Sequence, residues 1–221
     1  AIYTQQLKSL IVDSCIFLRN RGRLGSGLYV VNVTSVTLSN TDFVENYAVS
    51  GGGSFLRNVD YVSVSNCNFT DNRATVIGAG LVLEASNSSS ISNSLFKSNG
   101  AGTHGGAVSI HKSIELTDIT GNTFQQNTAS YGSALFLRKA NQWTFSGNTI
   151  TRNSCLRYGG TVRWVRGSSA NQDLMAAPIV DSGNSYLDNV YGTGGGDSQG
   201  ISTEVYDITM TPDNFTVTDY V

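Results

Sequence analysis

The sequence repeats the tetrapeptide Phe-x-x-Asn at a nearly fixed step. Complete copies begin at Phe17, Phe43, Phe69, Phe96 and Phe124, and degenerate copies begin at Ile150 and Tyr186. Consecutive copies are 26, 26, 27, 28, 26 and 36 residues apart, so the last interval contains an insertion. A period of about 20 to 50 residues is typical of a solenoid, whose units bury their apolar faces only by stacking on one another. We therefore expect one elongated domain of stacked coils.

Within each repeat the apolar residues recur with the period of a β-strand. Around Phe69, apolar Val62 and Val64 alternate with polar residues, and Gly78-Ala79-Gly80 precedes a second apolar run at residues 81–83. Period two indicates strands with one buried face. Coils of about 26 residues have no room for helices, and three strands per coil describe a parallel β-helix. We predict an all-β parallel β-helix of about seven coils over residues 1–200, followed by a C-terminal β tail over residues 201–221.

The asparagine of each repeat is predicted to lie inside the coil. A side-chain amide both donates and accepts, so stacked asparagines can form a ladder to one another or to turn backbone. The alternative is that they are ordinary turn residues. Two positions after each asparagine the residues are mostly small: Gly22, Ala48, Ala74, Ala101, Ala129, Cys155 and Tyr191. This column predicts close approach of successive coils.

Phe-x-x-Asn combined with Gly-Gly-Ala-Val resembles the repeats of the polymorphic outer-membrane protein family, within the broader pectin-lyase-like group. The second motif is complete at Gly105 to Val108, and variants stand at residues 51–54, 132–135 and 159–162. The resemblance covers about residues 12 to 196. It implies a right-handed β-helix displayed outside the cell, with adhesive or structural rather than enzymatic work.

Composition narrows the classes of partner. Charged residues make up 14% of the chain and the net charge is −2, which gives no reason to expect nucleic acid. No apolar run of about 18 residues is present, so we expect no membrane span. Four Asn-x-Ser/Thr sequences are candidate glycosylation sites: Asn32, Asn68, Asn87 and Asn214. Together with the repeat type they favour an extracellular or cell-surface location. We predict no cofactor and no metal.

Carboxylates are the natural candidates for polysaccharide cleavage, because glycoside hydrolysis requires paired acids. Asp42 has no acidic neighbour in its column of the stack. Glu45 and Asp71 share a column flanked by Arg19 and Lys97, and we interpret them as a solvated charge ladder. We therefore predict no catalytic residues.

The histidines and cysteines also receive simple interpretations. His104 and His111 are predicted surface residues, because the sequence places no serine or cysteine partner beside them. Cys15 and Cys67 occupy one column two coils apart, beyond the reach of a disulfide. With Cys155 they are predicted to be buried free thiols and not zinc ligands.

The distribution of charge suggests an assembly mode. The first coil is basic and the tail is acidic, and the residues expected to act in assembly are Lys8, Arg19, Arg21, Arg23, Glu204, Asp207, Asp213 and Asp219. An acidic tail pairing with the basic first coil of the next molecule would build a head-to-tail filament. The alternative is that the tail folds back and caps its own coil.

The first functional reading is a non-enzymatic extracellular structural or adhesive β-helix that self-associates head to tail and contacts glycans or other cell-surface ligands. The second reading is a carbohydrate-binding or polysaccharide-cleaving β-helix. An outer aromatic strip would favour the second, and the outward candidates are Tyr47, Tyr131, Tyr158 and Trp164. Their columns are scattered, so we favour the first.

Overall fold

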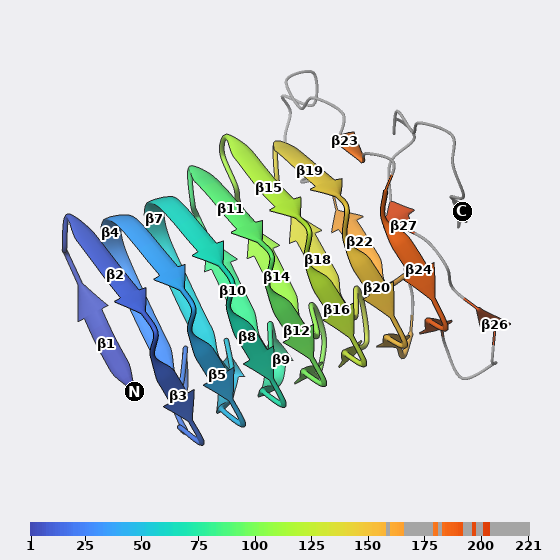
Figure 1. Cartoon of the computed structure of the whole chain (residues 1–221), viewed down its shortest axis with the longest axis horizontal. Helices are drawn as coiled ribbons and strands as arrows, with labels where there is room; N and C mark the ends of the chain where they lie inside the picture. The colour runs from blue at the N-terminus through green and yellow to red at the C-terminus, as the bar shows by residue number, and fades with distance from the viewer. Residues whose placement is uncertain (158–159, 166–178, 181–182, 192–195, 198–200, 204–221) are drawn as a thin grey trace.

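A computed structural model describes residues 1–157, 160–165, 179–180, 183–191, 196–197 and 201–203. This part of the chain is an all-β parallel solenoid of about six turns that contains no helix. The first coil, with β1 (Ile2–Gln5), lies at one end of the rod in Figure 1, and β24 (Ser185–Leu187) lies near the other. The sequence contains seven copies of the tetrapeptide, complete and degenerate, and seven copies enclose six intervals of about one turn each. The all-β, stacked-coil prediction is confirmed.

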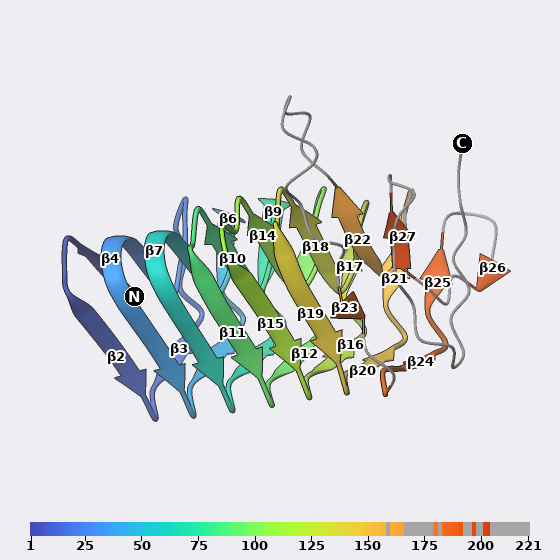
Figure 2. The same cartoon turned by 90° about the horizontal axis from the view of Figure 1, so that it is seen from above.

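The strands form three sheets that run the length of the rod (Figure 2). The largest sheet has 13 strands and two arms. Its first arm contains β1, β4 (Leu28–Ser39), β7 (Ser54–Ser65), β10 (Leu81–Glu84), β14 (Val108–His111), β18 (Leu135–Arg138), β22 (Val162–Val165) and β27 (Ile201–Thr203). Its second arm contains β2 (Ser9–Asp13), the later halves of β4 and β7, β11 (Ser88–Ser92), β15 (Leu116–Thr120), β19 (Gln142–Ser146) and β23 (Ile179–Val180).

The two other sheets have seven strands each. One is β3 (Ile16–Leu18), β5 (Asp42–Val44), β8 (Asn68–Thr70), β12 (Leu95–Lys97), β16 (Thr123–Gln125), β20 (Thr149–Thr151) and β24. The other is β6 (Tyr47–Ser50), β9 (Arg73–Ile77), β13 (Gly100–Ala101), β17 (Thr128–Ala129), β21 (Ser154–Cys155), β25 (Val190–Tyr191) and β26 (Gly196–Asp197). All pairings between coils are parallel, and β26 pairs antiparallel with β25.

From β10 onward each coil has four strands, one more than the three predicted. The coils of β4–β6 and β7–β9 have three, because one long strand there crosses both arms of the large sheet. The strands that were not predicted belong to the sheet that contains β6, β9, β13, β17, β21 and β25, where only a small-residue column was recognised. Strands such as Gly100–Ala101 are too short to show an alternating pattern. The predicted column itself is confirmed, since Ala48 pairs with Ala74, Ala74 with Ala101, and Ala129 with Cys155.

Residues with positive φ turn the chain at four corners of the coil. They stack in columns, such as Asn32, Asn58, Ala85, Lys112 and Lys139 between the two arms of the large sheet. At the corner before the first arm of the large sheet, the residue with positive φ is always glycine: Gly25, Gly51, Gly78, Gly105 and Gly132. A Cβ on Gly51 would lie 2.7 Å from the Ser54 carbonyl oxygen, so glycine is required there.

A stack of phenylalanine rings forms the centre of the core. Phe17, Phe43, Phe69, Phe96 and Phe124 follow one another with ring centroids 4.8, 4.7, 4.8 and 5.2 Å apart, and their planes are within 9° of parallel. Phe43 to Phe124 are fully buried. Ile150 continues the column beside Phe124, and Tyr186 lies beside Ile150. One buried aromatic side chain per coil supplies much of the apolar area that holds the coils together.

The asparagines form the predicted internal ladder. Asn72 Nδ2 donates to the Phe43 carbonyl at 2.8 Å and to Asn99 Oδ1 at 3.0 Å. Its own Oδ1 accepts from the backbone N–H and the Nδ2 of Asn46, both at 3.0 Å. All four hydrogen-bonding capacities of the buried amide are thus used. The pattern continues to Asn189, which accepts from Asn153 at 3.0 Å across the longest repeat interval.

A second ladder of the same kind was not predicted. Asn122 Nδ2 donates to Asn148 Oδ1 at 3.1 Å, and Asn148 donates in the same way to Asn184. In earlier coils a hydroxyl takes this place, since the Cys67 N–H donates to Ser94 Oγ at 3.1 Å. Different side chains thus accept the same backbone hydrogen bond, and this variety hid the column.

Candidate functional site

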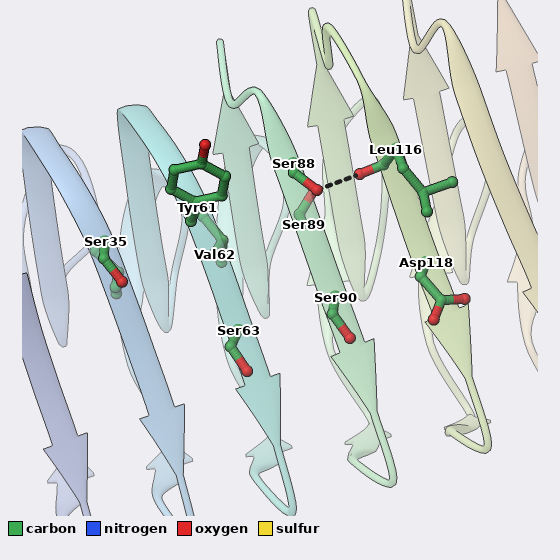
Figure 3. A pocket seen from close by; sticks show the side chains of 10 residues that line it. Ser35, Tyr61, Val62, Ser63, Ser88, Ser89, Ser90, Leu116 and Asp118 are labelled. Atoms are coloured by element: carbon green, nitrogen blue, oxygen red, sulfur yellow. Dashed lines mark hydrogen bonds between the residues drawn. The ribbon is translucent and has the colours of Figure 1, made fainter.

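A shallow groove of about 270 Å³ lies on the outer face of the second arm of the large sheet. It crosses β4, β7, β11 and β15 and therefore spans four coils (Figure 3). The lining residues are Ser35, Val36, Tyr61, Val62, Ser63, Ser88, Ser89, Ser90, Leu116 and Asp118. We refer to these residues as the serine groove.

The register of the coils brings these side chains together. Ser35, Tyr61, Ser88 and Leu116 pair across successive strands and form one row along the rod axis. Ser63, Ser90 and Asp118 form the next row, two residues further along each strand. Because alternate residues of a strand point to opposite faces, both rows point outward. Inward-facing Val36, Val62 and Ser89 lie between them as the floor.

The groove presents hydroxyl groups with free hydrogen-bonding capacity. Within the described residues the hydroxyls of Ser63 and Ser90 have no protein partner. Ser88 Oγ donates to the Leu116 carbonyl at 3.4 Å, a long bond that Figure 3 shows as a dashed line. Tyr61 is 57% exposed and stands beside the serine rows. The site therefore offers donors, acceptors and one aromatic ring to a bound molecule.

Asp118 is the single charged residue among those that line the groove. Thr144 Oγ1 donates a hydrogen bond to Asp118 Oδ1. Glycoside hydrolysis requires two carboxyl groups facing one bond, at about 5 to 10 Å from each other. The lining of the groove contains one carboxylate, that of Asp118.

The other carboxylates considered in the sequence analysis lie on a different sheet. Asp42 aligns with Ile16 and Asn68, as predicted, and accepts a hydrogen bond from Asn68 Nδ2 at 2.7 Å. Arg19 and Glu45 form the expected exposed ion pair, with Nε and Oε2 2.7 Å apart. The hydrogen bond and the attraction between the two charges favour the ionised form of each group. They lower the pKa of Glu45 and raise the pKa of Arg19.

Lys97 lies beside Asp71, since its carbonyl oxygen accepts from the Asp71 N–H at 3.0 Å, but it is not in the column of Glu45 and Asp71. It pairs with Thr70, the residue that precedes Asp71 in the sequence. The described residues contain no group of three or more His, Cys, Asp or Glu side chains that could hold a metal ion.

The two histidines pack around a buried ring instead of standing free on the surface. The rings of His104 and His111 lie 4.3 and 5.7 Å from the Phe136 ring, centroid to centroid, and His104 stacks on Tyr131 at 5.2 Å. Burial lowers the pKa of His111 to about 4 and also lowers the pKa of His104.

Both histidines have hydroxyl partners that were not predicted, and His104 Nδ1 lies 3.0 Å from Thr103 Oγ1. Ser109 Oγ and His111 Nε2 are 2.8 Å apart. Ser109 is fully buried, which keeps its hydroxyl from a substrate. We therefore do not assign this pair a nucleophilic role.

The cysteines differ in exposure. All three are free thiols, and Cys67 and Cys155 are buried, which raises the pKa of both. Cys15 is exposed, so the prediction that it is buried is wrong. It lies in the first coil of the structure, where only one neighbouring coil packs against it.

The candidate glycosylation and assembly residues are distributed as follows. Asn32 and Asn68 are exposed, Asn87 is half-buried, and Asn214 lies outside the described residues. Lys8, Arg19, Arg21 and Arg23 are exposed on the first coil. The acidic partners Glu204, Asp207, Asp213 and Asp219 lie outside the described residues, while Ile201–Thr203 at the start of the predicted tail pair with β22. Glycosylation and assembly remain predictions.

Trp164 is not an outward aromatic residue. It is 3% exposed and lies in the core beside Trp143, with ring centroids 6.1 Å apart. Tyr47 is 45% exposed and Tyr131 is half-buried, while Tyr158 lies outside the described residues. The outer aromatic residue beside the groove, Tyr61, was missed. Its signal was positional, because it stands eight residues before Phe69, in the column of Ser35 and Ser88.

Comparison with known proteins gave one match. A family model described as "Right handed beta helix region" matches residues 1–173. No curated protein and no solved structure matched the chain. No helix of the described residues is long and apolar enough to cross a membrane.

Proposed function

Because the chain belongs to the right-handed β-helix family, we propose that it acts outside the cell as a non-enzymatic structural and adhesive module. The observation that carries this proposal is the continuity of the stack. The phenylalanine column runs from Phe17 to Phe124 and is continued by Ile150 and Tyr186, and the asparagine ladder runs beside it to Asn189. The serine groove on the outer face has a single carboxylate. A rigid rod with side chains repeated along its surface suits adhesion and support. The likeness of its repeats to polymorphic outer-membrane proteins favours surface display.

The absence of catalysis is tested by incubating the purified protein with soluble polysaccharides and measuring new reducing or unsaturated ends over time. We expect no release of ends above that given by buffer. Time-dependent release that disappears in Asp118→Asn or Asp42→Asn would overturn the non-enzymatic proposal.

Display outside the cell is tested by peptide mapping of native material from a glycosylating host. Asn68 is exposed, whereas Asn153 is fully buried in the ladder with its amide donating to Asn189. We expect glycan on Asn68 and none on Asn153. A protein without glycan at Asn32, Asn68 and Asn87 in such a host would count against passage through the secretory pathway.

Head-to-tail assembly is a further part of the proposal. Its support is the exposed basic surface of the first coil, where Lys8, Arg21 and Arg23 form no ion pair within the described residues. Arg19 is already paired with Glu45 and therefore contributes less. Negative-stain imaging of native protein and of a variant lacking residues 204–221 tests this idea, because the deletion keeps β27. Filaments that persist undiminished in the deletion variant would contradict donation of the acidic tail.

A further inference from the structure

We propose that the serine groove binds a single strand of a neutral, unbranched glycan that lies along the rod axis. This inference rests on the proposed adhesive function and names the class of ligand for it. The ligand would span the four coils of β4, β7, β11 and β15. Three features of the groove support this ligand: its repeat, its hydrogen-bonding groups and its charge.

The repeat of the groove matches that of a linear polymer. Equivalent residues of neighbouring coils follow one another at the strand spacing of about 4.8 Å. The two outward rows run parallel to the axis, so a chain lying between them meets a new pair of side chains at every step. This step is close to the length of one sugar unit in an extended pyranose chain. Successive sugars would therefore meet the same two outward positions in successive coils, filled by different side chains.

The side chains provide the contacts that a sugar requires. A sugar ring has hydroxyls at its edge that donate and accept, and C–H groups on its faces. The unpartnered hydroxyls of Ser63 and Ser90 can serve the edge, because a hydroxyl both donates and accepts. The exposed ring of Tyr61 offers a flat apolar surface for one sugar face. Asp118 Oδ2 can accept from a further sugar hydroxyl, since Thr144 contacts Oδ1.

The charge of the groove selects against acidic polymers. Asp118 is its single charged lining residue, and no lysine or arginine lines it. Asp60 lies next to Tyr61 in β7, where it accepts a hydrogen bond from Asn87 at 3.0 Å. A polymer of uronic acids would bring like charges to this surface without a compensating cation. We therefore expect neutral glycans to bind and acidic ones to be rejected.

Binding is tested by titrating the full chain with cellohexaose, xylohexaose and mannohexaose, with the matching trisaccharides, and with an oligogalacturonate hexamer. Calorimetry or chemical-shift changes in labelled protein report the affinity. We expect at least one neutral hexasaccharide to bind, more tightly than its trisaccharide, and the oligogalacturonate to bind weakly or not at all.

Variants with matched controls place the ligand in the groove. Tyr61→Ala should weaken binding about tenfold or more, whereas Tyr47→Ala removes an exposed tyrosine from another sheet and should have no effect. Ser63→Ala with Ser90→Ala should weaken binding severalfold. Ser65→Ala with Ser92→Ala removes two hydroxyls from the same strands, outside the groove, and should leave binding unchanged. Circular dichroism verifies that each variant is folded.

Several outcomes would overturn the inference. These are the absence of binding by all three neutral hexasaccharides at millimolar concentration, equal binding by Tyr61→Ala, or preferential binding of the oligogalacturonate. Absence of both binding and cleavage would refute the groove while leaving the structural role intact. Cleavage of a bound glycan would refute the non-enzymatic function itself.

Discussion

The interior asparagine ladder and the outer serine groove use the same repeat in opposite ways. Inside, Asn72 makes four hydrogen bonds to neighbouring coils and has no capacity left. Outside, Ser63 and Ser90 stack with the same regularity but contact no protein partner within the described residues. Stacking alone therefore does not create a ladder. A side chain must reach the next coil and must be shielded from water for its hydrogen bonds to stabilise the fold.

The largest loss of folding stability is expected from a substitution in the phenylalanine stack, which lies beside the asparagine ladder. Phe69→Ala should lower the free energy of unfolding by about 3 to 5 kcal/mol, because it removes a fully buried ring that contacts rings on both sides. Denaturant unfolding followed by circular dichroism measures this loss. A loss below about 1 kcal/mol would mean that the phenylalanine stack contributes little to the stability of the core.

The ladder itself should respond nearly as strongly. Asn72→Ala should cost about 3 kcal/mol, because it leaves the buried backbone N–H of Asn46 without its acceptor and removes one hydrogen bond each from Asn46 Nδ2, Phe43 O and Asn99 Oδ1. Asn141→Ala is the control, since its amide also donates to a backbone carbonyl, at 2.8 Å from Ile114 O, but at an exposed contact. The control should lose less than about 1 kcal/mol. Equal losses in the two variants would remove the distinction between inside and outside.

His111 occupies an outward strand position yet behaves as an interior group, because it is largely buried. Its folded pKa of about 4 lies below its ordinary value of 6.5, so the unfolded chain binds more protons between these values. The contribution of the neutral, buried His111 to the free energy of unfolding is therefore fully present above pH 6.5. It is lost as the pH decreases towards 4. His111→Gln should reduce the acid loss over this window by about 2 kcal/mol, after allowance for partial solvent screening.

Unfolding free energies of the parent and His111→Gln proteins at several pH values measure the effect. Glu84 raises the pKa of His111, while His104, Arg138 and Lys112 lower it. The difference in unfolding free energy between the two proteins therefore includes the effects of these four neighbours. Parallel pH profiles for the two proteins would show that burial of His111 is not linked to stability.

The smallest effect is expected at exposed carboxylates. Asp42→Ala should change the unfolding free energy by less than about 0.5 kcal/mol, because its hydrogen bond to Asn68 is exposed to solvent. A larger loss in the same denaturant experiment would indicate that outer side-chain pairs also hold the coils together.

The features that could be predicted from the sequence are those with a constant residue type in each coil. Phe17 to Phe124 and their asparagines mark the core and the ladder because the same residue types recur there in five successive copies. The second ladder was missed because Cys67, Ser94 and Asn122 differ in chemistry while sharing a position. The short strands Gly100–Ala101 and Thr128–Ala129 carry too few residues for a periodic signal.

The groove was missed for a different reason. Ser63, Ser90 and Asp118 each look like an ordinary surface residue in their own coil. They stand six residues before Phe69, Phe96 and Phe124 respectively, so alignment on the phenylalanines places them side by side. Their contact depends on the register between coils, and no single window of the sequence contains it.

The longest repeat interval has a consequence for how such a chain can change. Asn153 and Asn189 are 36 residues apart, yet their amides meet at 3.0 Å, as do those of Asn72 and Asn99, which are 27 apart. The stacking rules therefore fix a few contact points in each turn and leave the length of chain between them free. Selection or a protein engineer can lengthen one connection, and so install a new recognition segment at a chosen height on the rod, while the neighbouring turns keep their alignment.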